Sequence, residues 1–191
     1  MLVPGKPANE TARVQALHGL ELLDSAPEER FDRLPRLAKR LFNVPIALVS
    51  LVDEDRQWFK ARVGLELCET SRDVAFCAHA ILGRDMLEVV DAREDTRFSD
   101  NPLVTAEGGI RFYAGVPLLV DGQPLGTLCV IDTRPRQLDA TQRAALGDLA
   151  CAAGQLLLSH RSQNELVRHR QHLEDIVEQR THALVLARRA A

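Results

Sequence analysis

The feature that most constrains the fold is a pair of strand-like segments separated by a short turn. Residues 113–120 and 124–131 are rich in apolar residues, and Asp121-Gly122 lies between them. An Asp-Gly pair favours the type I′ turn, whose twist matches that of two antiparallel strands. The segment therefore predicts a β-hairpin and an antiparallel sheet at this point.

A second pair of strands is predicted earlier in the chain. Residues 44–52 are nearly all apolar, which is typical of a strand covered on both faces. Turn residues 53–56 follow, and residues 57–63 resemble a returning strand that ends at Gly64. Residues 87–90 are a fifth strand candidate. Strands joined by tight turns, with helices before and after them, predict an α+β domain.

Two helices are predicted before the first strand. Asn9 can cap a helix whose apolar residues continue at helical spacing to Leu23, and residues 24–27 end it. A second amphipathic helix is expected from Glu28 to about Phe42, and Pro35 inside it is a candidate kink.

A long helix is predicted at the end of the sequence. After Thr141 the only glycines are Gly147 and Gly154, no proline occurs, and Asp139 or Thr141 can cap the helix. A heptad register fits it, with polar seam residues at 159–170. The apolar seam residues expected to dimerise are Leu149, Leu156, Leu166, Leu173, Val177 and Leu184. Such a stripe must be buried on another helix, which predicts a coiled coil and a parallel homodimer.

Composition excludes several classes of function. The chain has 24 Lys and Arg against 27 Asp and Glu, and this net charge of −3 argues against a nucleic-acid binder. Apolar runs fall short of the roughly 18 residues that cross a bilayer, and the first residues lack the pattern of a signal peptide. We therefore expect a cytoplasmic protein that is not inserted in a membrane. The four cysteines lack C-x-x-C spacing, so we expect reduced thiols and no metal site.

Several ordered blocks of the sequence closely resemble a GAF domain. These blocks are residues 31–34, 44–53, 56–60, 73–81, 100–104, 110–115 and 126–132. They are similar to GAF domains found upstream of bacterial sensor histidine kinases and diguanylate cyclases. Residues 173–184 also resemble the signalling helix that enters such output modules.

The resemblance implies an antiparallel sheet with a ligand pocket on one face, helices on the other, and terminal helices that pack as a dimeric bundle. It leaves the ligand and any cofactor unknown, because the family binds cyclic nucleotides, bilins, haem, other small molecules or no known ligand. The Asn-Lys…Phe…Asp-Glu pattern of cyclic-nucleotide-binding GAF domains is not found here in that order. Ala78 separates Cys77 from His79, which argues against bilin attachment.

The ligand-binding candidates come from the irregular segment 65–110 and from two strands. Long irregular segments often form binding loops, although a solvated connection is the alternative. The candidate pocket residues are Phe76, Cys77, His79, Asp91, Phe98, Asn101, Arg111, Phe112, Tyr113 and Cys129. Cys77 can equally belong to the core and His79 can make a structural hydrogen bond. Arg111 can bind an anionic ligand, or it can tie the irregular segment to the sheet through a carboxylate such as Asp91.

Two functional hypotheses follow. The first is a sensory module that binds a small ligand or a partner and signals through its C-terminal helix to a histidine kinase or diguanylate cyclase, fused or separate. It divides into an N-terminal helix (1–24), the sensor domain (25–158) and the signalling helix (159–191), and it is not an enzyme. The alternative is a GAF-fold enzyme similar to the free methionine sulfoxide reductases, with Cys77 and Cys129 as the attacking and resolving thiols.

Overall fold

The computed structural model describes residues 1–190, with side chains described through residue 182. The elements are α1 (Glu10–His18), α2 (Glu29–Phe42), β1 (Ile46–Val52), β2 (Arg56–Val63), β3 (Glu69–Ser71), the 3-10 turn η1 (Arg72–Val74), α3 (Phe76–Ala80), β4 (Leu87–Val89), α4 (Pro102–Thr105), β5 (Phe112–Val120), β6 (Gln123–Asp132) and α5 (Ala140–Ala190). Residues 1–157 form one compact unit and the chain from residue 158 a second.

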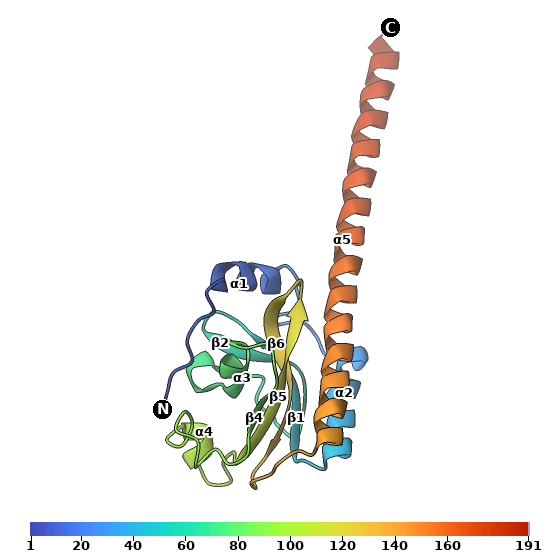
Figure 1. The fold of residues 1–191 in the computed structure, drawn as a ribbon. Helices are drawn as coiled ribbons and strands as arrows, with labels where there is room; N and C mark the ends of the chain where they lie inside the picture. The colour runs from blue at the N-terminus through green and yellow to red at the C-terminus, as the bar shows by residue number, and fades with distance from the viewer. Residues whose placement is uncertain (191) are drawn as a thin grey trace. The chain divides into compact units, whose positions relative to one another are not determined.

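The strands form a six-stranded sheet with the order β3-β2-β1-β6-β5-β4. Every neighbouring pair is antiparallel, and the pairing of β1 with β6 joins the two predicted hairpins into one sheet (Figure 1). Asp121 and Gly122 have φ values of 50° and 74°, as a type I′ turn requires. The predicted α+β architecture with an antiparallel sheet is confirmed.

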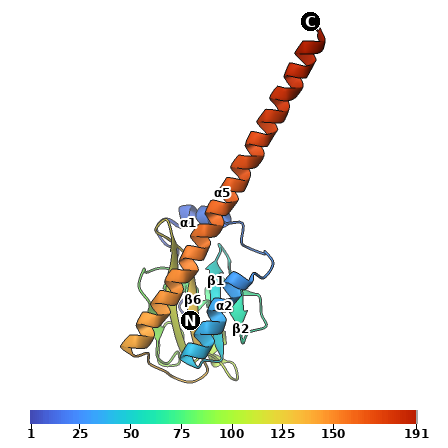
Figure 2. The ribbon, with the colours of Figure 1, turned by 90° about the vertical axis from the view of Figure 1, so that its right-hand side faces the viewer.

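Helices cover the two faces of the sheet in different ways. The amphipathic helix α2 and the first part of α5 lie along one face, whereas the short helices α3 and α4 lie over the other (Figures 1 and 2). On the first face, α5 buries a stripe at helical spacing, formed by Leu146, Ala150, Ala153 and Leu157. The layer on the opposite face is built from the short helices α3 and α4 and the loops between them.

Several element boundaries differ from the sequence-based prediction. The first helix ends at His18, and the chain then turns through Glu21 and Asp24, which have positive φ, although Leu20 and Leu22 remain buried. Leu20 and Leu22 match the apolar spacing of a helix, so the sequence predicted a longer one. In the structure they reach the core from turns. Helix α2 runs through Pro35. The segment expected to be irregular contains β4, which matches the predicted strand at 87–90, and also β3, η1, α3 and α4.

The predicted cap of the last helix has the geometry of a capping box. The backbone N–H of Gln142 donates to the Asp139 carboxylate at 2.8 Å, and the backbone N–H of Asp139 donates to Gln142 Oε1 at 3.0 Å. Of the predicted seam residues, Leu149 and Leu156 are half-buried, while Leu166, Leu173 and Val177 are 62–68% exposed. The side chain of Leu184 lies outside the described residues. The coiled coil therefore stays a prediction. No helix in the described part of the chain is long and apolar enough to span a membrane.

Candidate functional site

A cavity of about 140 Å³ lies between the sheet and the layer formed by α3 and α4. Strands β1, β2, β5 and β6 form its floor, and α3, α4 and the segment after β2 close over it. The lining residues are Ile46, Leu48, Gln57, Phe59, Leu65, Leu67, Thr70, Ala75, Phe76, Cys77, Leu103, Ile110, Tyr113 and Ile131. None of them is Asp, Glu, Lys, Arg or His, and the cavity is mainly apolar.

Two polar side-chain atoms of the lining are buried without a hydrogen-bond partner. Gln57 is 5% exposed, and neither its Oε1 atom nor the Oγ1 atom of Thr70 is paired. The two residues face each other across the β2–β3 ladder, which places their side chains on the same face of the sheet. A buried polar atom without a partner costs roughly 1–3 kcal/mol. This pair is therefore ready to bind a polar group inside the cavity.

A sulfur cluster borders the cavity through Cys77 and Tyr113, whereas its third member, Cys129, is not among the lining residues. The Sγ atoms of Cys77 and Cys129 are 3.9 Å apart, and the Tyr113 hydroxyl donates to Cys77 Sγ at 3.4 Å. All three side chains are buried. Burial opposes thiolate formation, but hydrogen bonds from Cys129, Ser50, Thr127 and Tyr113 outweigh it and lower the pKa of Cys77 to about 7. The pKa of Cys129 is raised because the sulfur of Cys77 and burial both disfavour a second thiolate there.

The predicted aromatic residues lie at different depths. Phe76, Cys77 and Tyr113 line the cavity, and Phe98 stacks on Phe76 with 4.0 Å between the ring centroids. Phe98 supports the wall from behind and is itself fully buried. Phe112 is also fully buried but is not among the lining residues, since its side chain points to the opposite face of β5 from that of its neighbour Tyr113.

Two predicted polar residues hold the irregular segment together. His79 Nε2 lies 3.1 Å from the Leu2 carbonyl oxygen, and burial lowers the pKa of His79, as does the nearby Arg97 charge. Asn101 is buried; its side chain accepts from the backbone N–H of Leu103 at 2.9 Å and donates to the Val74 carbonyl at 3.0 Å. Asn101 therefore caps α4 and joins it to η1, and neither residue is part of the cavity lining.

Of the two roles considered for Arg111, the structure shows the pairing with a carboxylate, that of Asp91. Its Nε donates to Asp91 Oδ1 at 2.7 Å, its Nη2 bonds the other carboxylate oxygen, and the hydrogen bonds lower the pKa of Asp91. The pair ties the loop after β4 to the start of β5. Neither side chain lines the cavity.

The sequence did not predict the polar pair Gln57 and Thr70, nor the apolar residues Leu65 and Leu67 at the mouth of the cavity. One signal was available for Gln57. Side chains alternate along a strand, so Gln57 shares a face with Phe59, two residues on. Thr70 carried no such signal, because β3 has only three residues and was not predicted.

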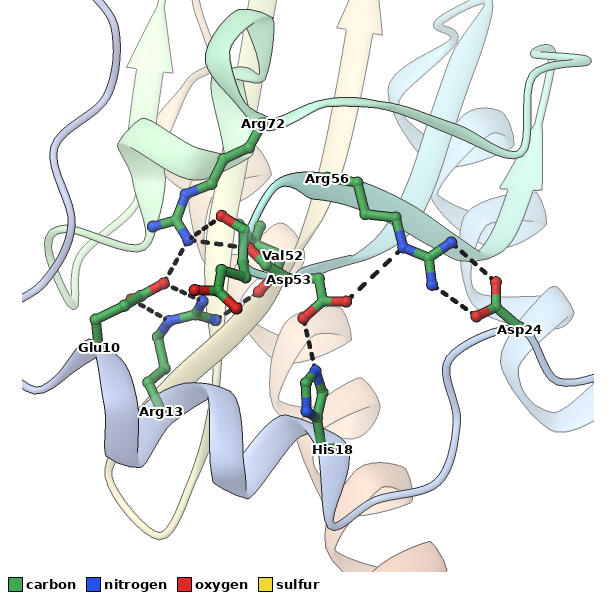
Figure 3. Close-up of polar contacts among 9 residues, drawn as sticks. Glu10, Arg13, His18, Asp24, Val52, Asp53, Arg56 and Arg72 are labelled. Atoms are coloured by element: carbon green, nitrogen blue, oxygen red, sulfur yellow. Dashed lines mark hydrogen bonds and ion pairs between the residues drawn. The ribbon is translucent and has the colours of Figure 1, made fainter.

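An ionic cluster connects α1 to the β1–β2 turn and to η1 (Figure 3). Arg13 is fully buried; its Nε and Nη2 donate to Glu10 at 2.7 Å, and its Nη1 donates to the Val52 carbonyl at 2.6 Å. Arg72 bonds Glu10 and donates to the Asp53 carbonyl at 2.9 Å. Burial of Glu10 opposes ionisation, but the two guanidinium groups outweigh it and lower the pKa of Glu10 to about 2. The cluster fixes η1, which joins Thr70 to the α3 wall of the cavity.

The fold, the cavity on one face of the sheet and the order of the elements agree with one protein family. The model of the GAF domain matches residues 26–157. The chain belongs to the GAF domain family. Within the part of the chain that the structure describes, no three His, Cys, Asp or Glu residues gather as metal ligands.

Comparison with individual proteins gives one similar sequence and many similar folds. The chain is 47% identical over 137 residues to a protein named Cyclic di-GMP phosphodiesterase PA2567 from Pseudomonas aeruginosa, which covers 71% of this chain. The match spans only 23% of that relative's length.

Two solved structures illustrate the range of proteins that share the fold. The free methionine-R-sulfoxide reductase of Neisseria meningitidis has a TM-score of 0.58 at 19% identity, covering 86% of this chain and 99% of that one. A domain of a two-component sensor histidine kinase protein from Sinorhizobium meliloti has a TM-score of 0.57 at 18% identity, covering 76% and 99%. At these identities the likeness establishes the fold alone.

Proposed function

We propose that this chain is the small-molecule sensing module of a signalling protein. The observation that carries the proposal is the pair of unpartnered polar atoms, Gln57 Oε1 and Thr70 Oγ1, inside an otherwise apolar cavity. A region that serves only as a core fills such a space and pairs such atoms. A ligand that enters the cavity would satisfy both atoms and bury the apolar lining.

The module would act on an output domain, fused or separate, of the cyclic di-GMP or histidine kinase class. The similar sequence from Pseudomonas aeruginosa is named for cyclic di-GMP hydrolysis, and this chain spans about a quarter of it. A domain from a sensor histidine kinase protein has the same fold. These names support an output of this kind.

The signal would pass through a parallel homodimer of α5. Leu166, Leu173 and Val177 are exposed and follow the heptad spacing, and a second copy of the helix would cover them. A cytoplasmic location belongs to the same proposal, because the four cysteines lack the spacing of a disulfide framework.

The module is proposed to have no catalytic activity of its own. The competing candidate is a thiol reductase, which the close Cys77 and Cys129 sulfurs and the low pKa of Cys77 favour. Incubation with free methionine-R-sulfoxide and a dithiol reductant separates the two. We expect no methionine to form, and methionine formation that depends on Cys77 would replace the sensor proposal with the enzyme.

The sensor proposal is tested by native mass spectrometry of the protein after incubation with a mixture of cellular metabolites. We expect the wild type to retain a molecule that is released on denaturation. Ala75 lines the cavity, so Ala75→Phe would fill it and abolish retention, whereas the exposed Ala144 on α5 allows Ala144→Phe as a matched control. Retention of nothing by the wild type, or equal retention by Ala75→Phe, would contradict the proposal.

A further inference from the structure

The size of the cavity limits what can enter it. Its volume of about 140 Å³ is close to that of a cavity of roughly 150 Å³, lined by aliphatic and aromatic side chains, that accepts benzene. One six-membered ring with a small substituent therefore fills the space. A cyclic dinucleotide or a tetrapyrrole is several times larger.

The lining also limits the charge of the ligand. Of the cavity residues described above, none is basic, and the acidic groups are the Cys77 thiol and the Tyr113 hydroxyl, whose ionised forms would repel an anion. Burying an unpaired ion in such surroundings costs far more than burying a neutral group. The mouth is apolar as well, because the half-buried Leu65, Leu103 and Ile110 and the 56% exposed Leu67 belong to it. The occupant is therefore neutral and mostly hydrocarbon.

The two orphaned polar atoms define the substituent. Gln57 Oε1 is an acceptor and needs a donor, whereas the Thr70 hydroxyl can both donate and accept. A hydroxyl group between them donates to Gln57 and accepts from Thr70, so it satisfies both with one atom. The Tyr113 hydroxyl, by contrast, already donates to Cys77.

We infer that the cavity binds a neutral, single-ring aromatic molecule bearing a hydroxyl group, that is, a phenol-class ligand. This inference rests on the proposed sensory function and names the chemical class of its ligand. A phenolic hydroxyl has a pKa of about 10 and remains uncharged near neutral pH. The ring lies among Leu48, Phe59 and Phe76, and the hydroxyl points to the β2–β3 edge of the cavity.

The test is isothermal titration calorimetry with three probes of similar size, namely phenol, benzene and benzoate. We expect phenol to bind most tightly, benzene to bind about tenfold more weakly because it leaves both polar atoms unpaired, and benzoate not to bind. Gln57→Met and Thr70→Val nearly keep the side-chain volume and remove the carboxamide and the hydroxyl, respectively. Each should weaken phenol about tenfold and should not weaken benzene, which makes no hydrogen bond to either residue. Gln15→Met, at an exposed position on α1, is the matched control and should change neither.

Several outcomes would overturn the inference. Benzene binding as tightly as phenol, benzoate binding more tightly than phenol, or unchanged phenol affinity in both folded variants would each do so. The same holds if no probe binds at millimolar concentration and a crystal structure shows only water between Gln57 and Thr70. If native mass spectrometry nevertheless finds a retained ligand that is charged or larger, the phenol class is wrong and the sensory function stands. If nothing is retained, both fail.

Discussion

At the scale of single residues, Cys77 has the most unusual chemistry in the domain. Four donors surround its sulfur and lower its pKa from 9.0 to about 7, while the pKa values of Cys129 and Tyr113 are raised. Because the unfolded chain holds more protons than the folded one between these pH values, this thiol makes stability rise from about pH 7 to about pH 9. We expect ultraviolet thiolate absorbance to develop with a midpoint near pH 7.

The exposed cysteines would obscure this titration, so it is measured in a background with Cys68→Ser and Cys151→Ser. Adding Cys77→Ser should remove the midpoint near neutral pH, whereas Cys129→Ala should leave a thiol whose pKa is shifted upward because one donor is lost. A first midpoint at or above about pH 9 in the background protein would show that the donors do not outweigh desolvation.

Glu10 should make the domain sensitive to acid. Its pKa falls from 4.5 to about 2 on folding because Arg13 and Arg72 stabilise the carboxylate more than burial disfavours it. The stabilisation is complete above about pH 4.5 and is lost as the pH falls towards about 2. After allowance for solvent screening it amounts to about 1–2 kcal/mol. The urea midpoints of wild type and Glu10→Gln should therefore converge as the pH falls, and a gap that is independent of pH would contradict this role.

The candidate site was predicted from sequence only in part. Phe76, Cys77 and Tyr113 were recognised because they lie in blocks that resemble the family. Asn101 and Arg111 lie in such blocks too, yet their side chains are used to fix loops. The blocks that resemble the family indicate which residues have a particular role. Whether such a side chain faces a ligand or fixes a loop depends on its direction, which only the tertiary structure defines.

At the scale of elements, the pairing of β1 with β6 depends on a close approach of two backbones. A Cβ atom added at Gly126 would lie 1.9 Å from the Ser50 carbonyl oxygen. Gly126→Ala should therefore lower the free energy of unfolding by at least about 2 kcal/mol. Gly147 on α5 has no atom near its Cβ position, so Gly147→Ala should raise stability by roughly 0.5–1 kcal/mol. The two variants should therefore shift the thermal midpoint of unfolding in opposite directions. Equal shifts would show that β1 and β6 can move apart to accommodate the added methyl group.

The elements that sequence predicted well are those with a local cause. The Asp121-Gly122 turn and the Asp139 cap are defined by neighbouring residues, and both occur as expected, whereas Asn9 lies at the N-cap of α1 without a side-chain cap hydrogen bond. The end of α1 and the short strand β3 were missed because their positions depend on distant contacts. Leu20 and Leu22 follow the helical pattern, yet they are buried from turns against the rest of the domain.

At the scale of the whole molecule, the C-terminal part of α5 carries an apolar stripe that is exposed to solvent. Leu166, Leu173 and Val177 are exposed in the single chain, and each side chain that becomes buried contributes about 1.5–3 kcal/mol. Polar seam residues at 159–170 make the helix pair weaker near the domain. A second copy of the helix in parallel register would bury the stripe, so we expect a homodimer.

Sedimentation of the wild type and of a double variant tests this dimer. Leu166→Lys with Leu173→Lys places four charges in the dimer seam, which should yield monomers because unpaired charges are costly to bury. Gln171→Lys with Gln179→Lys adds the same charge outside the seam and should leave the dimer intact. Since the first unit has its own core, its thermal unfolding should be unchanged in both variants. A wild type that sediments as a monomer at tens of micromolar, or a dimer that survives the seam lysines, would show that the stripe is covered in another way.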